Sequence, residues 1–140
     1  MTSHDQETGS VSTEFAVVMA AFLTAFMLIV VMAGRIASAE NDVANAAQEA
    51  ARAASLQRQP DLAADSARQT AAANLANTGL SCTSGFTVDV DTSRLQPGGT
   101  VTVTVACTPP FSDVAALAVP GTRTFTSTAV EVVDTYRSDP

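Results

Sequence analysis

The spacing of hydrophobic residues changes along this chain of 140 residues, and the first segment it defines is an uncharged apolar run over residues 15–34. At about 1.5 Å per helical residue, about 20 residues span about 30 Å, which is the thickness of a bilayer's hydrocarbon core. The run therefore predicts one transmembrane helix over residues 10–34, in a single-pass membrane protein.

The next segment is rich in Ala with scattered charges, and it contains no Gly or Pro between Ile36 and Gln59. Because nothing interrupts the pattern, we expect the membrane helix to continue beyond the bilayer until Pro60. Its expected apolar stripe comprises Ile36, Val43, Ala47, Ala50 and Ala54. A second Ala-rich helix is expected from Leu62 to about Asn77, with Asp61 as its N-cap and Gly79 as its C′ residue.

The second half of the chain alternates apolar and polar residues with period two, which is typical of half-buried strands. Residues 86–90 and 100–105 show this alternation, and Gln-Pro-Gly-Gly at 96–99 predicts a turn between them. The two strands should form an antiparallel hairpin. Residues 122–136 read as one long strand or two short ones, with a bulge near Ala129, and residues 112–119 as a short helix or an apolar loop.

These patterns together predict an α+β fold with a long N-terminal helix, a second Ala-rich helix and a small antiparallel C-terminal sheet. The expected organisation is a leader over residues 1–9, a transmembrane helix over 10–34, an extramembrane helical segment over 35–79 and a β-rich domain with one disulfide over 80–140.

The only two cysteines, Cys82 and Cys107, fall on the apolar parity of the two expected strands. If they face each other, Phe86 faces Val103 and Val88 faces Val101, so one register joins the cysteines and stacks apolar pairs. This coincidence favours a cross-strand disulfide. Two buried free thiols are the alternative, whereas two cysteines without a nearby histidine cannot make a metal site.

The charge balance is acidic, with 14 Asp and Glu residues against 7 basic ones. Nucleic acid is excluded as a partner because phosphate binding needs clusters of basic residues. The only histidine, His4, lies in the leader, and no nucleophile motif, phosphate-binding loop or zinc-protease motif is present. The sequence indicates no enzyme, no cofactor, no metal and no small-molecule substrate.

Asp89 and Asp91 share the outward face of an expected strand and could be read as a functional carboxylate pair. A solvated sheet face explains them more simply.

A carboxylate, Glu14, stands at the mouth of the apolar run, where a charge near lipid is unfavourable. If the chain is cut between Gly9 and Ser10, Ser10 gains an ammonium group four residues before Glu14, the spacing of one helical face. The carboxylate could then pair with an ammonium on its own chain or on a neighbour's. The simpler alternative is an interfacial charge without a partner.

Small residues recur at a spacing of four within the expected membrane helix: Ser12, Ala16, Ala20 and Thr24. Such a stripe could let another helix approach closely. The alternative is that these residues only face lipid.

The Gly9-Ser10 junction followed by Glu14, Phe15 and a long apolar helix resembles a type IV prepilin processing site. Together with Gly34-Arg35 and the segment Asn-Ala-Ala-Gln-Glu-Ala-Ala-Arg at 45–52, it resembles the TadE-like proteins of the tight-adherence (Flp) pilus machinery. The resemblance implies a minor pilin or pseudopilin that a prepilin peptidase cuts after Gly9. The partners it implies are other pilins, the pilus assembly platform and the membrane. The leader departs from the pattern because it has no Lys or Arg.

Two topology signals disagree. Arg35 and Arg52 follow the apolar run while nothing basic precedes it, so charge bias alone puts the C-terminal side in the cytoplasm. A disulfide instead requires an oxidising compartment. We give the cysteines precedence and expect a cytoplasmic N-terminus with the C-terminal domain outside. Two other functions are possible: a secreted binding protein whose signal sequence is cut after Ala39, in the small-residue pattern at 37–39, and a membrane-tethered enzyme, which the lack of a histidine outside the leader disfavours.

Overall fold

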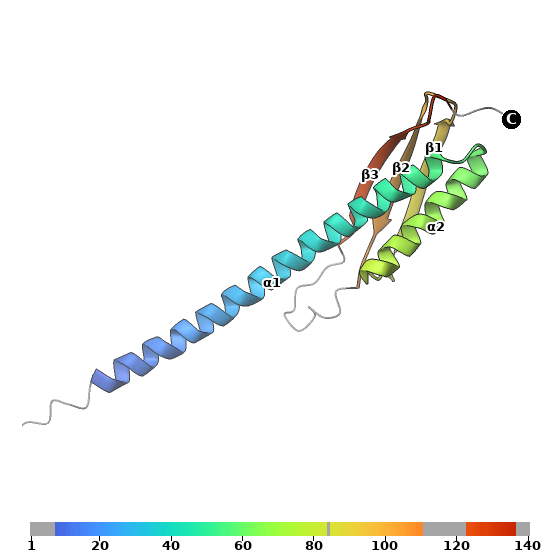
Figure 1. Cartoon of the computed structure of the whole chain (residues 1–140). Coiled ribbons are helices and arrows are strands. Elements are labelled where there is room, and N and C mark those ends of the chain that lie inside the picture. Colours follow the sequence, from blue (N-terminus) through green and yellow to red (C-terminus); the bar gives the residue numbers. More distant parts are fainter. Residues whose placement is uncertain (1–7, 84, 111–122, 137–140) are drawn as a thin grey trace, which may run out of the picture. The chain divides into compact units, whose positions relative to one another are not determined.

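The structure is a computed structural model that describes residues 8–83, 85–110 and 123–136, with side chains from Thr13 onward. Two helices precede three strands, so the predicted α+β class is confirmed (Figure 1). The elements are α1 (Thr8–Ser55), α2 (Pro60–Thr78), β1 (Phe86–Arg94), β2 (Thr100–Cys107) and β3 (Phe125–Val132). The chain divides into two compact units, Met1–Ala37 and Ser38–Pro140, and each is described by itself.

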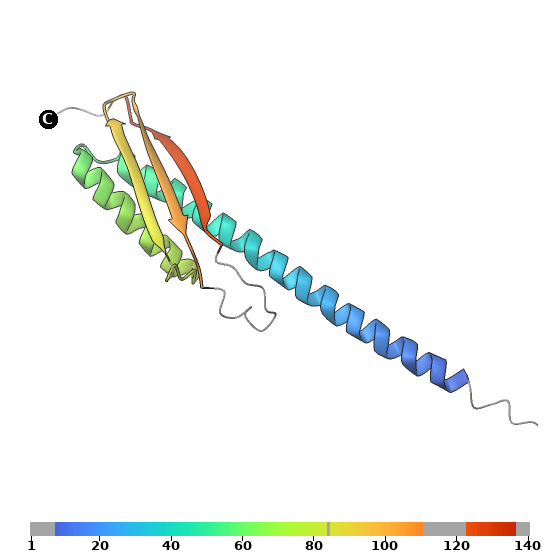
Figure 2. The ribbon, with the colours of Figure 1, turned by 180° about the vertical axis from the view of Figure 1, so that it is seen from behind.

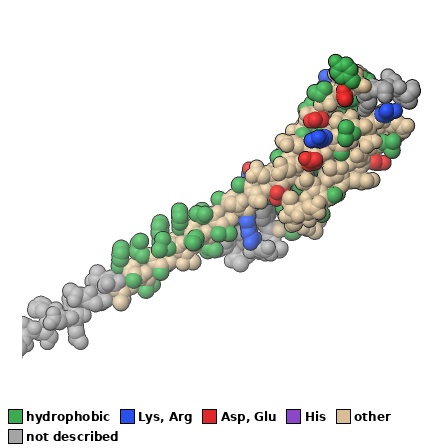
Figure 3. All heavy atoms as spheres, in the orientation of Figure 1, with side chains coloured by type: hydrophobic (Ala, Val, Ile, Leu, Met, Phe, Trp, Pro, Cys, Tyr) green, Lys and Arg blue, Asp and Glu red, His purple; other side chains and the backbone are tan. Residues whose placement is uncertain are grey.

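In the first unit, α1 exposes its apolar side chains on all sides. Every residue from Thr13 to Val31 is exposed, including Phe15, Phe22 and Phe26. Hydrophobic side chains, drawn in green, stand out along this helix in Figure 3. A soluble protein rarely leaves so large an apolar surface in water. Among the described residues this helix alone is long and apolar enough to cross a membrane, as expected for a single-pass membrane protein.

The second unit has two layers, with α2 and the later part of α1 on one face of the sheet (Figures 1 and 2). The core of this unit is built from small residues. Alanines line the helices at spacings of three and four, and valines line β2 at a spacing of two. Fully buried residues include Val43, Ala47, Ala50 and Ala54 on α1, Ala63, Ala67 and Ala71 on α2, and Val101, Val103 and Val105 on β2. The apolar stripe expected on the extramembrane helix is therefore confirmed at Val43, Ala47, Ala50 and Ala54, which are its positions in this unit.

The ends of α2 correct one prediction and confirm another. Asp61 is not the N-cap: the helix begins at Pro60, two residues before the predicted start at Leu62, with Gln59 as a cap that makes no side-chain hydrogen bond. The reason is that proline's fixed φ suits the first helical position, which Pro60 takes, so Asp61 lies in the first turn. At the other end Gly79 has φ 76°, and Leu80 N–H donates to the Leu75 carbonyl over 3.0 Å. This is the predicted glycine closure.

The sheet is an antiparallel meander in the order β1-β2-β3. Phe86 pairs with Cys107 and Val88 with Val105, so the predicted register, Phe86 with Val103 and Val88 with Val101, is wrong by four residues. Cys82 lies before β1, in a turn closed by a 3.1 Å hydrogen bond from Gly85 N–H to its carbonyl. A shift of four residues keeps every side chain on the same face, so parity alone could not detect the error.

The β1–β2 hairpin closes through the predicted turn at residues 96–99. Gly99 N–H donates to the Gln96 carbonyl over 2.8 Å, and Gly98 has φ 77° after Pro97, as a type II turn requires. The register shifts between Asp91 and Arg94, just before this turn.

Strand β3 pairs with β2 without interruption, from Cys107 opposite Phe125 to Thr100 opposite Val132. The bulge expected near Ala129 is therefore absent, and Ala129 faces Val103. The alternation slips there because Val130 and Val132, which are 59% and 66% exposed, lie on the uncovered face of the sheet. The short helix or loop expected over 112–119 lies outside the described residues.

Candidate functional site

The predicted processing junction lies at the start of α1. Gly9 and Ser10 belong to the first turn of the helix, while their side chains lie outside the described ones. Glu14 and Phe15 follow on the exposed helix surface, and Phe15 is 66% exposed. None of the ion pairs among the described residues involves Glu14. In the uncut chain Ser10 nitrogen is a peptide nitrogen, so the charge pair predicted for Glu14 requires the cut.

The small-residue stripe of the first unit is accessible. Ala16, Ala20 and Thr24 share one helix face and are exposed, and Ser12 extends the same spacing with a side chain outside the described ones. Thr24 Oγ1 donates to the Ala20 carbonyl over 2.8 Å, so this hydroxyl is satisfied within its own helix. The described part of this face is therefore suitable for close helix packing, because its one hydroxyl donor is already satisfied.

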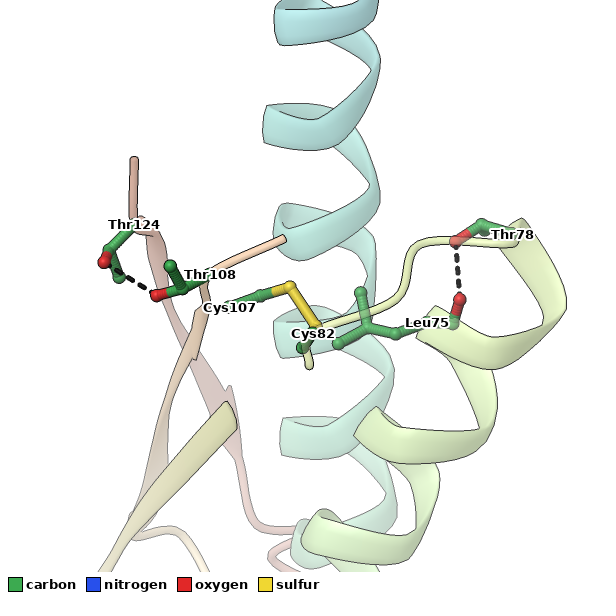
Figure 4. The surroundings of a disulfide bond; sticks show 6 residues. All are labelled: Leu75, Thr78, Cys82, Cys107, Thr108 and Thr124. Carbon is green, nitrogen blue, oxygen red and sulfur yellow. Dashed lines mark hydrogen bonds between the residues drawn. A yellow bond between two sulfur atoms is a disulfide. The ribbon is translucent and has the colours of Figure 1, made fainter. Parts of the chain in front are cut away.

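The disulfide between Cys82 and Cys107 is present, and their Cα atoms are 5.2 Å apart (Figure 4). It joins the connection after α2 to the last residue of β2. Cys107 is fully buried and Cys82 half-buried. Beside it, the hydroxyls of Thr108 and Thr124 lie 2.8 Å apart and link the chain after β2 to the chain before β3. The cysteine pairing is confirmed although the register argument that led to it was wrong.

Asp89 and Asp91 lie on the solvated face of the sheet, as the simpler interpretation of the sequence expects. Both are exposed on β1, and Asp91 Oδ1 accepts a 2.9 Å hydrogen bond from Ser93 N–H. Hydrogen bonds from Ser93 lower the pKa of Asp91 below its ordinary value. The bond thus stabilises the bend above the ordinary pKa of a carboxyl and is lost as the pH falls through the lowered one. Within the described ranges, no three His, Cys, Asp or Glu side chains are placed to hold a metal ion.

Charged side chains gather on the second unit (Figure 3), and one of their contacts joins residues far apart in sequence. Arg123 donates to Glu40 Oε1 over 3.2 Å, which joins the chain before β3 to α1. The Arg123 guanidinium also lies 5.5 Å from the centre of the Phe125 ring. This pair could not be predicted from the sequence, because its partners are 83 positions apart and share no local pattern.

The chain from Gly9 to Arg52 therefore combines the Gly-Ser junction, Glu14, the exposed apolar helix and the first part of the buried alanine face. Residues 9–52 match the family model described as TadE-like protein. This segment is TadE-like. The match confirms the resemblance drawn from the sequence, and it ends before α2 and the sheet. No curated protein and no solved structure matches the chain. The TadE-like segment thus indicates a role related to the tight-adherence pilus, and the family is not known as enzymatic.

Proposed function

We propose that the protein is a minor pilin or pseudopilin that takes part in assembly of a tight-adherence (Flp) pilus. The observation that carries the proposal is the TadE-like match over residues 9–52, which begins at the Gly9-Ser10 junction and includes the exposed apolar helix. The role is structural and not catalytic: helix packing in the membrane and contacts of the second unit outside it.

The proposed maturation is a cut by a prepilin peptidase after Gly9. The new ammonium group of Ser10 then pairs with Glu14 of an adjacent subunit, where the low local dielectric strengthens the attraction between the charges. Phe15 follows Glu14 at the apolar end of this motif. The stripe of Ser12, Ala16, Ala20 and Thr24 is the proposed contact with a neighbouring pilin helix. The partners are other pilins, the peptidase and the assembly platform.

The proposed orientation places the N-terminus in the cytoplasm and residues 38–140 outside it. The disulfide between Cys82 and Cys107 supports this orientation, because such bonds persist in oxidising compartments. Alkylation of the protein in intact cells, without reductant, checks it. We expect no labelling of Cys82 or Cys107, and labelling of both would contradict the orientation.

Mass spectrometry of the mature N-terminus is the direct test of the function. An N-terminus at Ser10 supports a processed pilin, and co-purification of other pilins with it supports assembly. An N-terminus at Glu40 would instead support the secreted binding protein cut after Ala39. An N-terminus at Met1 or Thr2 would contradict both processing events.

A further inference from the structure

The outer edge of β3 is the feature of the second unit that the proposed function leaves without a role. Within the described ranges β3 is an edge strand that pairs only with β2. Over its eight residues it has no Pro, Gly or Lys and no register shift, and its only charge is Glu131. Edge strands normally block further pairing with such features.

The opposite edge shows the contrast. Strand β1 has charged side chains at Asp89, Asp91 and Arg94, and its register shifts between Asp91 and Arg94. Charges and bulges of this kind protect an edge from pairing with another strand. One edge of the sheet is therefore protected and the other is not.

The hydrogen-bond pattern shows which groups β3 offers. Val133 N–H donates to the Gly99 carbonyl over 2.9 Å, and its carbonyl accepts from Gly98 N–H over 3.1 Å, so Val133 turns its backbone toward the hairpin. Because backbone direction alternates along an antiparallel strand, every second residue before it turns its N–H and C=O outward. These residues are Thr126, Thr128, Val130 and Val132.

A groove runs between this edge and α1. One hollow, of about 400 Å³, is lined by Gln48, Glu49 and Arg52 of α1 and by residues 127–131 of β3. A second, of about 460 Å³, is lined by Glu40 and Val43 of α1 and by residues 123–127. Ser127 lines both hollows, so they follow one another along the strand. The Glu40–Arg123 ion pair crosses from α1 to the chain just before β3, and both residues line the second hollow.

We propose that this groove binds an extended peptide segment of another protein chain, which adds to the sheet as a fourth strand next to β3. A helix beside an unpaired strand edge is the arrangement in which main-chain hydrogen bonds give affinity and the flanking side chains give selectivity. The groove lining is acidic on balance, with Glu40, Glu49 and Glu131 against Arg52 and Arg123. Residues with β-branched side chains suit an added strand, and the excess of acidic residues in the lining suits a basic residue opposite Glu131, so we expect both in the partner segment. This binding does not depend on the proposed pilus role.

The test uses the full chain in detergent micelles and a synthetic peptide of about eight residues, the length of β3. The peptide alternates Thr and Val around a central Arg, with blocked ends. At a free peptide concentration about ten times its Kd, we expect amide hydrogen exchange at Thr126, Thr128, Val130 and Val132 to slow by about tenfold. No slowing with this peptide would overturn the proposal.

Two substitutions separate strand addition from other binding. Thr128→Pro removes an outward N–H without removing a bond to β2, since proline is tolerated where the N–H of an edge strand faces solvent. It should abolish peptide binding, whereas Thr128→Ala should keep it, with the disulfide intact in both. Glu131→Gln should weaken the Arg peptide and leave an Ala counterpart unchanged. Equal binding by the Thr128 variants would contradict pairing at this edge.

Amide exchange measured without the peptide tests for two other occupants of the groove, a second copy of the protein and another segment of the same chain. Slow exchange at the four amides that increases with protein concentration would mean that a second copy occupies the groove. Slow exchange that is independent of concentration would mean that this chain covers its own edge. Either result would overturn the proposed partner segment.

Discussion

At the scale of single residues, Gly9 decides whether the proposed processing occurs. A side chain before the scissile bond crowds it, so Gly9→Val should remain uncleaved in the membrane, whereas Gly9→Ala should be cut. Mass spectrometry of the N-terminus and a gel shift measure the difference. Normal cleavage of Gly9→Val would make Gly9 an ordinary leader residue.

Glu14 is expected to act in assembly and not in folding. Its side chain is exposed on α1, so replacing it should not disturb the packed core of the second unit. Glu14→Gln removes the charge and keeps the shape. We expect insertion and the disulfide to be normal, while co-purification with partner pilins falls sharply because the proposed charge pair with the Ser10 ammonium group is lost. Glu14→Asp is the matched control that retains a carboxylate, and it should keep part of the association. If fibre formation and co-purification survive in Glu14→Gln, Glu14 is only an interfacial charge.

Gly99 is the residue whose hydrogen side chain the hairpin requires. A Cβ there would overlap the Arg94 carbonyl oxygen, which belongs to the backbone and cannot turn aside. Gly99→Ala should therefore destabilise the second unit by about 1–3 kcal/mol, the range for overpacked sites. Gly98→Asn is the control. A Cβ at position 98 would lie 3.8 Å from its nearest neighbour, Thr135 Oγ1, which is an ordinary contact, and Asn tolerates the positive φ of 77° found there. Denaturant unfolding in detergent should rank Gly99→Ala as the less stable variant, and the opposite order would contradict the clash.

At the scale of elements, the helices of the second unit pack through alanine. Ala47 and Ala50 are fully buried on α1, so there is no space for longer side chains. Ala50→Leu should destabilise the unit by about 1–3 kcal/mol. Asn45→Leu, at an exposed position of the same helix, is the control and should change stability little. Equal unfolding midpoints for the two variants would mean that α1 can move away from the sheet with little loss of stability.

Each element could be predicted from the sequence as far as its signal was local. The apolar periods gave both helices and the hairpin, and Gly79 and Pro97-Gly98 marked chain reversals because their backbone preferences are intrinsic. The start of α2 was misjudged, because Asp61 and Pro60 both favour a helix start and only the backbone conformation decides between them.

At the scale of the whole molecule, the features that join distant residues could not be predicted, apart from the disulfide, whose two cysteines are the only ones in the chain. The register of β1 on β2 was missed by four residues because any even shift keeps Val88 and Val90 on the core face. The groove beside β3 and the Glu40–Arg123 pair depend on how α1 and β3 pack, which no repeating pattern encodes. The N-terminal motif was readable because its residues are adjacent in sequence.

The disulfide also determines how the protein responds to mechanical force. It joins residues separated by 25 positions, and the β1–β2 hairpin lies within the closed loop. Tension applied between α1 and the C-terminus therefore passes from Cys82 to Cys107 through the sulfur atoms and bypasses the hairpin. At about 3.4 Å per residue, the intact disulfide makes the fully stretched chain shorter by roughly 85 Å. Single-molecule stretching with and without reductant should differ by this contour length, and equal lengths would contradict the force path. A subunit held in a membrane by α1 and pulled at its C-terminus would thus keep the β1–β2 hairpin out of the force path.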